Sequence, residues 1–428
     1  MGRIALVSEH ASPLTAAGQL DAGSQNVYVA ALSAALCGLG HEVVVYTRRT
    51  APRAPNRVRT QAGYEVVHVR SGPSRKLAED ESTARVTDFA RFLSADWNTK
   101  RPDVVHAQGW LSGITAVLGA RTRQVPVVQT FHTLGSADRS LAVERLLGQE
   151  VARVVATHSD EADGVLRMGI CGSKVSVIPH GVDLKLFTPH GATAPRDRAR
   201  RVVTVGQLVP HQGFDDLIRA LSTVEDTELV IAGGSANGRL RGAPEARRLR
   251  TLARSLGVAD RVVFTGHLRQ NELPALLRSA DVVACTPWHD SFGVNAIEAM
   301  ACGVPVVVTA VGGLVDAVVD EETGVRVPSQ DPRAISQALT TLLRNATRRK
   351  TLGAAGRERI RARYSWERVA ADLVRVYAGV IRPSPEETGA PEPQNNPRVL
   401  RASAAKQVLP PEFGDTARLV RTEAGEPG

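Results

Sequence analysis

Short apolar runs alternate with amphipathic stretches along the first 180 residues. The apolar runs predict buried strands at 3–8, 42–47, 103–106, 125–130, 154–158 and 175–178. The stretches between several of them have helical spacing and predict helices at 24–37, 112–120 and 139–151. Because strand, loop, helix and next strand follow at short intervals, this half predicts parallel βαβ units.

The second half repeats the pattern. Strands are predicted at 202–205, 228–232, 261–264, 282–285 and 304–309, and helices at 213–221 and 243–256, with two or three more after residue 327, the last near 366–381. Two βαβ-rich halves of similar size predict an α/β protein with a cleft between two parallel sheets. In open parallel sheets, ligands bind beyond the carboxyl ends of the strands, so the residues directly after strands are the candidates for function.

Composition shifts mark the predicted domain limits. The first domain is expected at 1–187 and the second at 201–364, joined by a linker at 188–200 that is rich in proline, glycine and charge. A further helical segment is expected at 365–382. The proline-rich residues 383–428 have no periodicity and predict a disordered tail.

The charge balance is basic, with a net charge of +9 and 43% apolar residues over 428 positions. The arginines occupy scattered helical positions without interleaved aromatics, which argues against nucleic acid as a partner. Contact with an anionic membrane surface stays an open alternative. The start of the chain runs directly into a strand, so no signal peptide is expected. No apolar run approaches the roughly 20 residues of a membrane span.

The four cysteines, Cys37, Cys171, Cys285 and Cys302, form no CxxC pair. Their small or apolar neighbours predict reduced core residues of a cytoplasmic protein. Several catalytic motifs are also missing: no GxGxxG follows the first strand, and there is no P-loop, no HExxH and no carboxylate cluster at metal-site spacing.

Six segments together resemble one family, the retaining GT-B glycosyltransferases of "group 1" or family 4, which includes sucrose-phosphate synthases and mycothiol glycosyltransferases. They are residues 21–29, 104–113, 129–135, 177–183, 205–213 and 286–316. The resemblance implies two Rossmann-like domains facing a central cleft, with the 365–382 helix crossing back to the first domain. It also implies that the second domain holds a nucleotide-sugar donor, here a UDP- or GDP-sugar, and the first an acceptor, without metal or cofactor.

Residues 286–316 carry the donor side of that resemblance. In the family, the acid at Glu298 binds the ribose and the acid at Asp290 contacts the transferred sugar. Backbone N–H groups of Phe292, Gly293 and Val294 would meet sugar or phosphate oxygens, which suits the unpaired donors at a helix start. The helix around Glu298 is apolar, and a buried acid there needs a partner.

The first domain supplies the remaining candidates. Gly23 would let the backbone approach a phosphate, with Ser24 beside it, and a histidine at the place of His132 lies near the transferred sugar in the family. An ordinary turn glycine and a strand-end histidine are the alternatives. His106 and His180 are expected to be structural. The acceptor side is assigned to Asn26, Trp110 and Thr133.

Four positions depart from the family pattern. Gln207 and Gln212 replace an arginine and a lysine that clamp the donor diphosphate, Asp290 replaces glutamate, and Ser24 replaces glycine. Because glutamine supplies no charge to the leaving group, a second hypothesis is a weakly active or inactive relative that binds nucleotide sugars or serves as a scaffold.

Acceptor and assembly are less constrained by the sequence. Relatives that use phosphorylated polyols keep a tyrosine and basic residues near Gly109 and beyond Gly135, so a phosphorylated acceptor is not predicted. The oligomeric state is left open.

Overall fold

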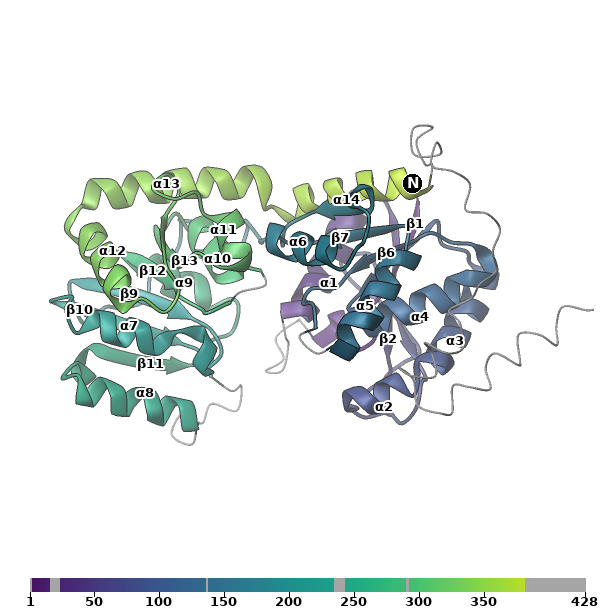
Figure 1. Ribbon diagram of the computed structural model, residues 1–428, viewed down its shortest axis with the longest axis horizontal. Coiled ribbons are helices and arrows are strands. Elements are labelled where there is room, and N and C mark those ends of the chain that lie inside the picture. Colours follow the sequence, from purple (N-terminus) through teal and green to yellow (C-terminus); the bar gives the residue numbers. More distant parts are fainter. Residues whose placement is uncertain (1, 16–23, 136–137, 235–242, 290–291, 382–428) are drawn as a thin grey trace, which may run out of the picture.

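The chain folds into two sheet domains that lie side by side, each with helices packed around its sheet (Figure 1). This computed structural model describes residues 2–15, 24–135, 138–234, 243–289 and 292–381. The element order confirms the predicted α/β class with two parallel-sheet, Rossmann-like halves.

The first sheet has eight strands in the order β3-β4-β2-β1-β5-β6-β7-β8, and every neighbouring pair except β3 and β4 is parallel. Its inner strands are Val-rich and buried along their length, as expected for a sheet covered on both faces. The elements are β1 Arg3–Val7, α1 Ser24–Gly38, β2 Glu42–Arg48, β3 Arg57–Arg59, β4 Glu65–Val69, α2 Glu79–Thr83, α3 Val86–Thr99, β5 Val104–Gln108, α4 Trp110–Ala120, β6 Val127–Thr130, α5 Asp138–Glu150, β7 Arg153–Ala156, α6 Ser159–Arg167 and β8 Val175–Val177.

The second sheet has six parallel strands in the order β11-β10-β9-β12-β13-β14. The elements are β9 Arg200–Val205, α7 Phe214–Leu221, β10 Thr227–Ala232, α8 Pro244–Ser255, β11 Val262–Gly266, α9 Leu273–Arg278, β12 Val282–Cys285, α10 Val294–Ala301, β13 Val306–Thr309, α11 Gly312–Ala317, β14 Val325–Val327, α12 Pro332–Arg344, α13 Ala346–Arg363 and α14 Trp366–Ile381. From β9, the strands that follow along the chain lie to one side up to β11 and to the other side from β12 onward. The loops after β9 and β12 therefore open at the switch point of the sheet.

The region between 48 and 103 contains structure that the sequence analysis did not predict. β3 and β4 extend the first sheet at one edge, and α2 and α3 follow. β3 is a three-residue strand with exposed Arg57 and Arg59 and lacks an apolar pattern. In β4, His68 interrupts the apolar run, and its Nδ1 is satisfied by the carbonyl of Pro55 at 2.6 Å.

The end of the predicted first domain packs against the second sheet. Val182 and Phe187 lie in the core of the second sheet, and the Val182 amide donates to the carbonyl of Tyr364 at 2.8 Å. The predicted limits at 187 and 201 stay predictions. The predicted linker contains no helix or strand until β9 begins at Arg200, and Arg278 of α9 holds it against the second domain by donating to carbonyls there.

The last helix, α14, crosses back and completes the core of the first domain (Figure 1). Trp366, Leu373 and Tyr377 are buried against Tyr28 and neighbouring side chains of α1. The junction leaves no spare room: a Cβ added at Gly181 would lie 2.4 Å from the Trp366 ring. The two domains are thus joined by the chain at 181 and again at 365.

The cysteine prediction is correct for Cys285 and Cys302, which are buried, and wrong for Cys171. Cys171 is exposed in the short connection between α6 and β8, where its Sγ lies 3.2 Å from Ser173 Oγ. Cys37 is half-buried near the end of α1. Apolar sequence neighbours do not bury a residue in a surface turn.

Helices α6 and α11 form a reciprocal contact between the domains, which we call the interdomain clasp. Asp316 of α11 accepts from the Ser159 amide at 2.6 Å and from its hydroxyl at 2.9 Å. Asp160 of α6 accepts from the Gly312 amide at 3.1 Å. Each carboxylate therefore meets the electropositive start of the opposite helix, where an anion is favoured.

The clasp predicts a measurable effect on domain arrangement. Replacing both acids (Asp160→Ala with Asp316→Ala) removes the charge-assisted contacts, so we expect a larger radius of gyration by small-angle scattering. Because the carboxylates are partly exposed, the loss should be only about 1 kcal/mol, or roughly 2–4 °C in Tm. The matched control is Asp163→Ala, an exposed acid of the same helix. An unchanged scattering profile in the double variant would show that the clasp does not hold the domains.

Candidate active site

A cavity of about 440 Å³ lies between the two domains at the carboxyl ends of their strands. The first domain contributes residues that follow β6 and β7, including His132 and His158. The second contributes residues that follow β12 and β13, including Trp288, His289 and Gly312. This is the position at which parallel α/β sheets bind ligands.

A second cavity, of about 680 Å³, lies between α1, the segment 180–187 and α10. Glu298 and Val294 of α10 line it together with His180 and Trp366. The two cavities flank an aromatic cluster, because His132 lines the first cavity and His180 the second. Tyr28 and Phe292 contact both imidazole rings, with ring centroids between 4.9 and 5.6 Å apart.

His132 directly follows β6 in a left-handed conformation, with φ at 69°, which is unusual for a residue with a side chain. Its Nε2 lies 2.7 Å from Gln108 Oε1, so Nε2 carries the proton and Nδ1 is left as an acceptor. Nδ1 is buried and has no hydrogen-bond partner among the described residues. Burial, with smaller contributions from other histidines, lowers the pKa of His132 to about 3 and keeps the ring neutral.

Glu161 of α6 stabilises the backbone of His132 in this conformation. Its carboxylate accepts from the Thr157 amide at 2.7 Å and hydroxyl at 2.6 Å, and from the backbone of His132. Burial raises the pKa of Glu161. Neither Glu161 nor Gln108 was predicted as a site residue. The sequence signal for Glu161 is an acid in the first turn of a helix that directly follows a strand.

Of the other two histidines of this region, only His106 has no free ring nitrogen; His180 Nε2, like His132 Nδ1, is buried without a partner among the described residues. His106 has both ring nitrogens occupied, by Tyr377 OH at 2.7 Å and Thr130 Oγ1 at 2.9 Å, and so connects α14 to β5 and β6. His180 places Nδ1 2.8 Å from the Gly181 carbonyl. Burial lowers the pKa of His106 to about 3 and that of His180 to about 4.

Glu298 lies on α10 with only 7% of its surface exposed. Burial raises the pKa of its carboxyl to about 8. No hydrogen bond or ion pair joins the carboxylate to any part of the chain that the structure describes, although it faces the second cavity. A buried carboxylate without a partner in a native fold points to a ligand that supplies donors. Asn295 anchors the same helix by donating to the Val205 carbonyl at 2.9 Å.

Gln207 and Gln212 lie in the loop after β9. Gln207 is exposed, and Gln212 folds over the backbone: a Cβ at Gly206 would lie 2.5 Å from its Oε1. Gly213 adopts φ 70°, and a Cβ there would lie 1.9 Å from the Thr286 carbonyl. Only glycine fits this approach, which brings the loops after β9 and β12 together.

The acceptor-side candidates separate into different environments. Asn26 donates to the Ser12 carbonyl and to Thr15 Oγ1, both at 2.9 Å, and thus holds the loop after β1. Trp110 starts α4 and packs against the core of the first domain. Thr133 is exposed and lines the smaller cavity. Nothing in the structure tests whether any of them contacts an acceptor.

Three predicted site positions cannot be placed. Gly23 and Asp290 lie outside the described residues, and of Ser24 only the backbone, at the start of α1, is described. Phe292 belongs to the aromatic cluster, and Gly293 and Val294 form the start of α10, with Gly293 at φ 65°. Their proposed contacts with donor oxygens stay predictions.

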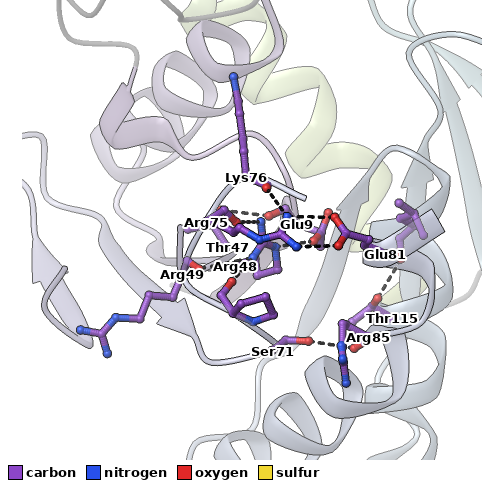
Figure 2. Close-up of polar contacts among 12 residues, drawn as sticks. Glu9, Thr47, Arg48, Arg49, Ser71, Arg75, Lys76, Glu81, Arg85 and Thr115 are labelled. Carbon is purple, nitrogen blue, oxygen red and sulfur yellow. Dashed lines mark hydrogen bonds and ion pairs between the residues drawn. The ribbon is translucent and has the colours of Figure 1, made fainter. Parts of the chain in front are cut away.

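A buried ion pair at the carboxyl end of β1 and β2 was also missed by the sequence analysis. Arg48 Nε donates to Glu9 Oε1 at 3.1 Å, and the guanidinium also donates to the carbonyls of Pro73 and Arg75. Arg75 in turn pairs with Glu81, and Figure 2 shows these contacts as one network. Arg48 therefore holds the loop at 73–75 against the carboxyl ends of β1 and β2.

Among the described residues, no three or more His, Cys, Asp or Glu side chains lie together so that they could hold a metal ion. Within the same residues, none of the helices is long and apolar enough to cross a bilayer.

Two family models match successive parts of the chain. "Glycosyltransferase Family 4" matches residues 25–186, and "Glycosyl transferases group 1" matches residues 190–359. The first match covers most of the β1–β8 domain and the second most of the β9–β14 domain.

Similar curated proteins are named D-inositol 3-phosphate glycosyltransferase. The protein from Xylanimonas cellulosilytica is 36% identical over 414 residues, covering 90% of this chain and 98% of its own length. The protein from Salinispora tropica is 36% identical over 416 residues, covering 89% and 86% respectively.

Solved structures agree with this assignment. Sucrose-phosphate synthase from Thermosynechococcus elongatus superposes with a TM-score of 0.77 at 30% identity, covering 90% of this chain and all of that one. Anabaena HepE, solved with UDP and glucose, shares the fold, with a TM-score of 0.68 at 17% identity, covering 88% of this chain and all of that one. The chain belongs to the group 1, family 4 glycosyltransferases and is a GT-B enzyme that uses a nucleotide-sugar donor.

Proposed function

We propose that this enzyme is a retaining glycosyltransferase that moves a hexose from a UDP- or GDP-sugar to an acceptor hydroxyl without a metal ion. The observation that carries the proposal is a pair of buried polar groups on opposite domains for which the described residues supply no hydrogen bond. One is His132 Nδ1 in the first domain, and the other is the Glu298 carboxylate, 7% exposed, in the second.

The donor side is assigned to the second domain. The two oxygens of Glu298 match the adjacent hydroxyls of a ribose, and two O–H donors would offset the desolvation that raises its pKa to about 8. The start of α10 at Phe292, Gly293 and Val294 directs backbone N–H groups to the same space, where phosphate or sugar oxygens would bind.

The reaction follows from these positions. The acceptor oxygen bonds to the anomeric carbon on the face from which the diphosphate leaves, and the hydroxyl proton passes to an oxygen of the leaving diphosphate. His132 is neutral, so it does not serve as an acid near pH 7; its Nδ1 accepts a hydrogen bond from a sugar hydroxyl and orients the donor. Closure of the domains excludes water from the cleft.

The acceptor we propose is a small polyol or glycan hydroxyl. The similar curated proteins are named D-inositol 3-phosphate glycosyltransferase, so inositol phosphate should be the first acceptor tested. Gly109 begins the α4 turn with φ 82° and has no side chain to contact a phosphate. We therefore propose an acceptor whose binding does not require a phosphate group. A cytoplasmic location is proposed with it, because nucleotide sugars and reduced cysteines both belong to that compartment.

A ligand screen tests the donor assignment. We expect one of UDP-glucose, UDP-N-acetylglucosamine, GDP-mannose and ADP-glucose to raise Tm, because a ligand that binds only the folded state stabilises it by RT ln(1 + [L]/Kd). The transferred product, followed by NMR, should keep the anomeric configuration of the donor. No Tm shift at millimolar concentrations of any donor would contradict the proposal, and inversion would contradict the retaining mechanism.

His132 supplies a second prediction. His132→Ala removes the acceptor at Nδ1, so we expect kcat to fall about 100-fold, within the usual range for a positioned polar group. Donor Kd, measured by calorimetry, should change much less. His267→Ala, an exposed histidine of the second domain, is the control and should leave both constants unchanged. Equal losses in kcat and donor affinity would indicate only a disturbed fold.

Glu298 predicts a pH-dependent stability. Its folded-state pKa of about 8 lies above the usual value of about 4.3, so ionisation opposes folding. The ligand-free protein should lose stability as pH rises between these values, by up to about 5 kcal/mol. Glu298→Gln should therefore stabilise the protein at pH 8.5 but hardly at pH 5, measured by urea unfolding. The same variant should bind donor more weakly. A stability difference that is constant with pH would contradict the raised pKa.

A further inference from the structure

We infer that His211 and His289 form an imidazole pair that binds the donor diphosphate and supplies the positive charge missing at Gln207 and Gln212. The inference rests on the proposed function, because it concerns the leaving group of that reaction. It names two residues that no sequence pattern singled out as a pair.

The pair is built by two loops at the switch point of the second sheet. His211 lies in the single turn Pro210–Gln212 after β9, and His289 follows β12. Their rings stack with centroids 5.0 Å apart and planes 17° apart. The Trp288 amide donates to the His211 carbonyl at 2.9 Å, which holds the loops together.

The position suits an anion. His289 is exposed and lines the interdomain cavity together with His132. Helix α7 begins at Phe214, directly after the His211 turn, and its cap, Gly213, offers no side chain to its amides. Two imidazoles beside the start of an eight-residue helix can donate several N–H groups to phosphate oxygens.

The charged groups around the histidine pair form hydrogen bonds or ion pairs with other residues, or lie on the opposite side of the cavity. On α7, Asp216 accepts from Trp288 Nε1 at 3.4 Å, and Asp215 pairs with Arg219 at 2.9 Å and with Arg248 of α8 at 3.6 Å. Across the cavity lie His158, Asp160, Glu161 and Arg167, of which Asp160 and Glu161 are hydrogen-bonded within the protein. Asp290, the next residue, lies outside the described residues.

A histidine side chain supplies positive charge to a phosphate only when it is protonated. A diphosphate diester bears two negative charges. The contribution of this pair to donor affinity should therefore require a proton and should fall as pH rises. An arginine and lysine clamp, which stays charged, would give neither effect.

Calorimetric titration of the wild-type enzyme with UDP-glucose and GDP-mannose tests the inference, because their diphosphates keep a constant charge between pH 6 and 8. Ionisation of Glu298 acts in the opposite direction over this range, so the contribution of the pair is the difference between wild type and variant. The Kd of the His211→Gln, His289→Gln double variant should exceed that of the wild type about tenfold at pH 6 and should approach it at pH 8. Buffers of different ionisation enthalpy should show less proton uptake on donor binding in the double variant than in the wild type.

Two further variants separate the alternatives. Adding Gln212→Lys to the double variant should restore affinity without restoring pH dependence, which would exclude a merely structural role. His267→Gln should change nothing. A ratio of double-variant to wild-type Kd that does not change between pH 6 and 8 overturns this inference alone. So does an affinity lost in Arg167→Gln but kept in the double histidine variant, because the charge then comes from α6. If none of the four nucleotide sugars of the ligand screen binds, the proposed function fails together with this inference.

Discussion

Parallel strand direction is the constraint on which the site depends. Every strand pair of the second sheet is parallel, and in the first sheet only β3 departs from this rule. All loops that follow strands therefore emerge at one edge of each sheet. The crossing helix α14 and the interdomain clasp then hold the two edges against each other. Residues such as His132 and His289 meet for this reason, although they belong to separate domains.

Two buried polar groups line the cavities between the domains. His132 Nδ1 has no hydrogen-bond partner among the described residues, and Glu298, only 7% exposed, faces the second cavity. Other buried polar atoms without a described partner, such as Glu228 Oε2 and Trp97 Nε1, lie inside one domain. Leaving a buried polar group unpaired costs free energy, so the two groups that line cavities are the ones that a polar ligand can satisfy.

Much of the fold could be predicted from sequence because Val-rich strands buried on both faces leave an unbroken apolar run, as in β2 and β13. β3 was missed because it is a short edge strand that carries two arginines, and β4, which lies between β3 and β2, was missed because His68 interrupts its apolar run. The burial of Glu298 was predictable from the apolar helix around it. The free Nδ1 of His132 was not, since it depends on Gln108 and Glu161 from other elements. The stacking of His211 on His289 likewise requires the two strands to be neighbours.

The crossing of α14 has a consequence for biosynthesis. Trp366, Leu373 and Tyr377 belong to the core of the domain that is translated first. That domain cannot bury its α1 face until translation has passed Tyr377, whereas the sheet of the β9–β14 domain is complete at Val327. Domains usually fold in the order of their synthesis. Here the second half can reach its native packing before the first, so the exposed apolar face of α1 would need protection, for example by a chaperone, while translation continues.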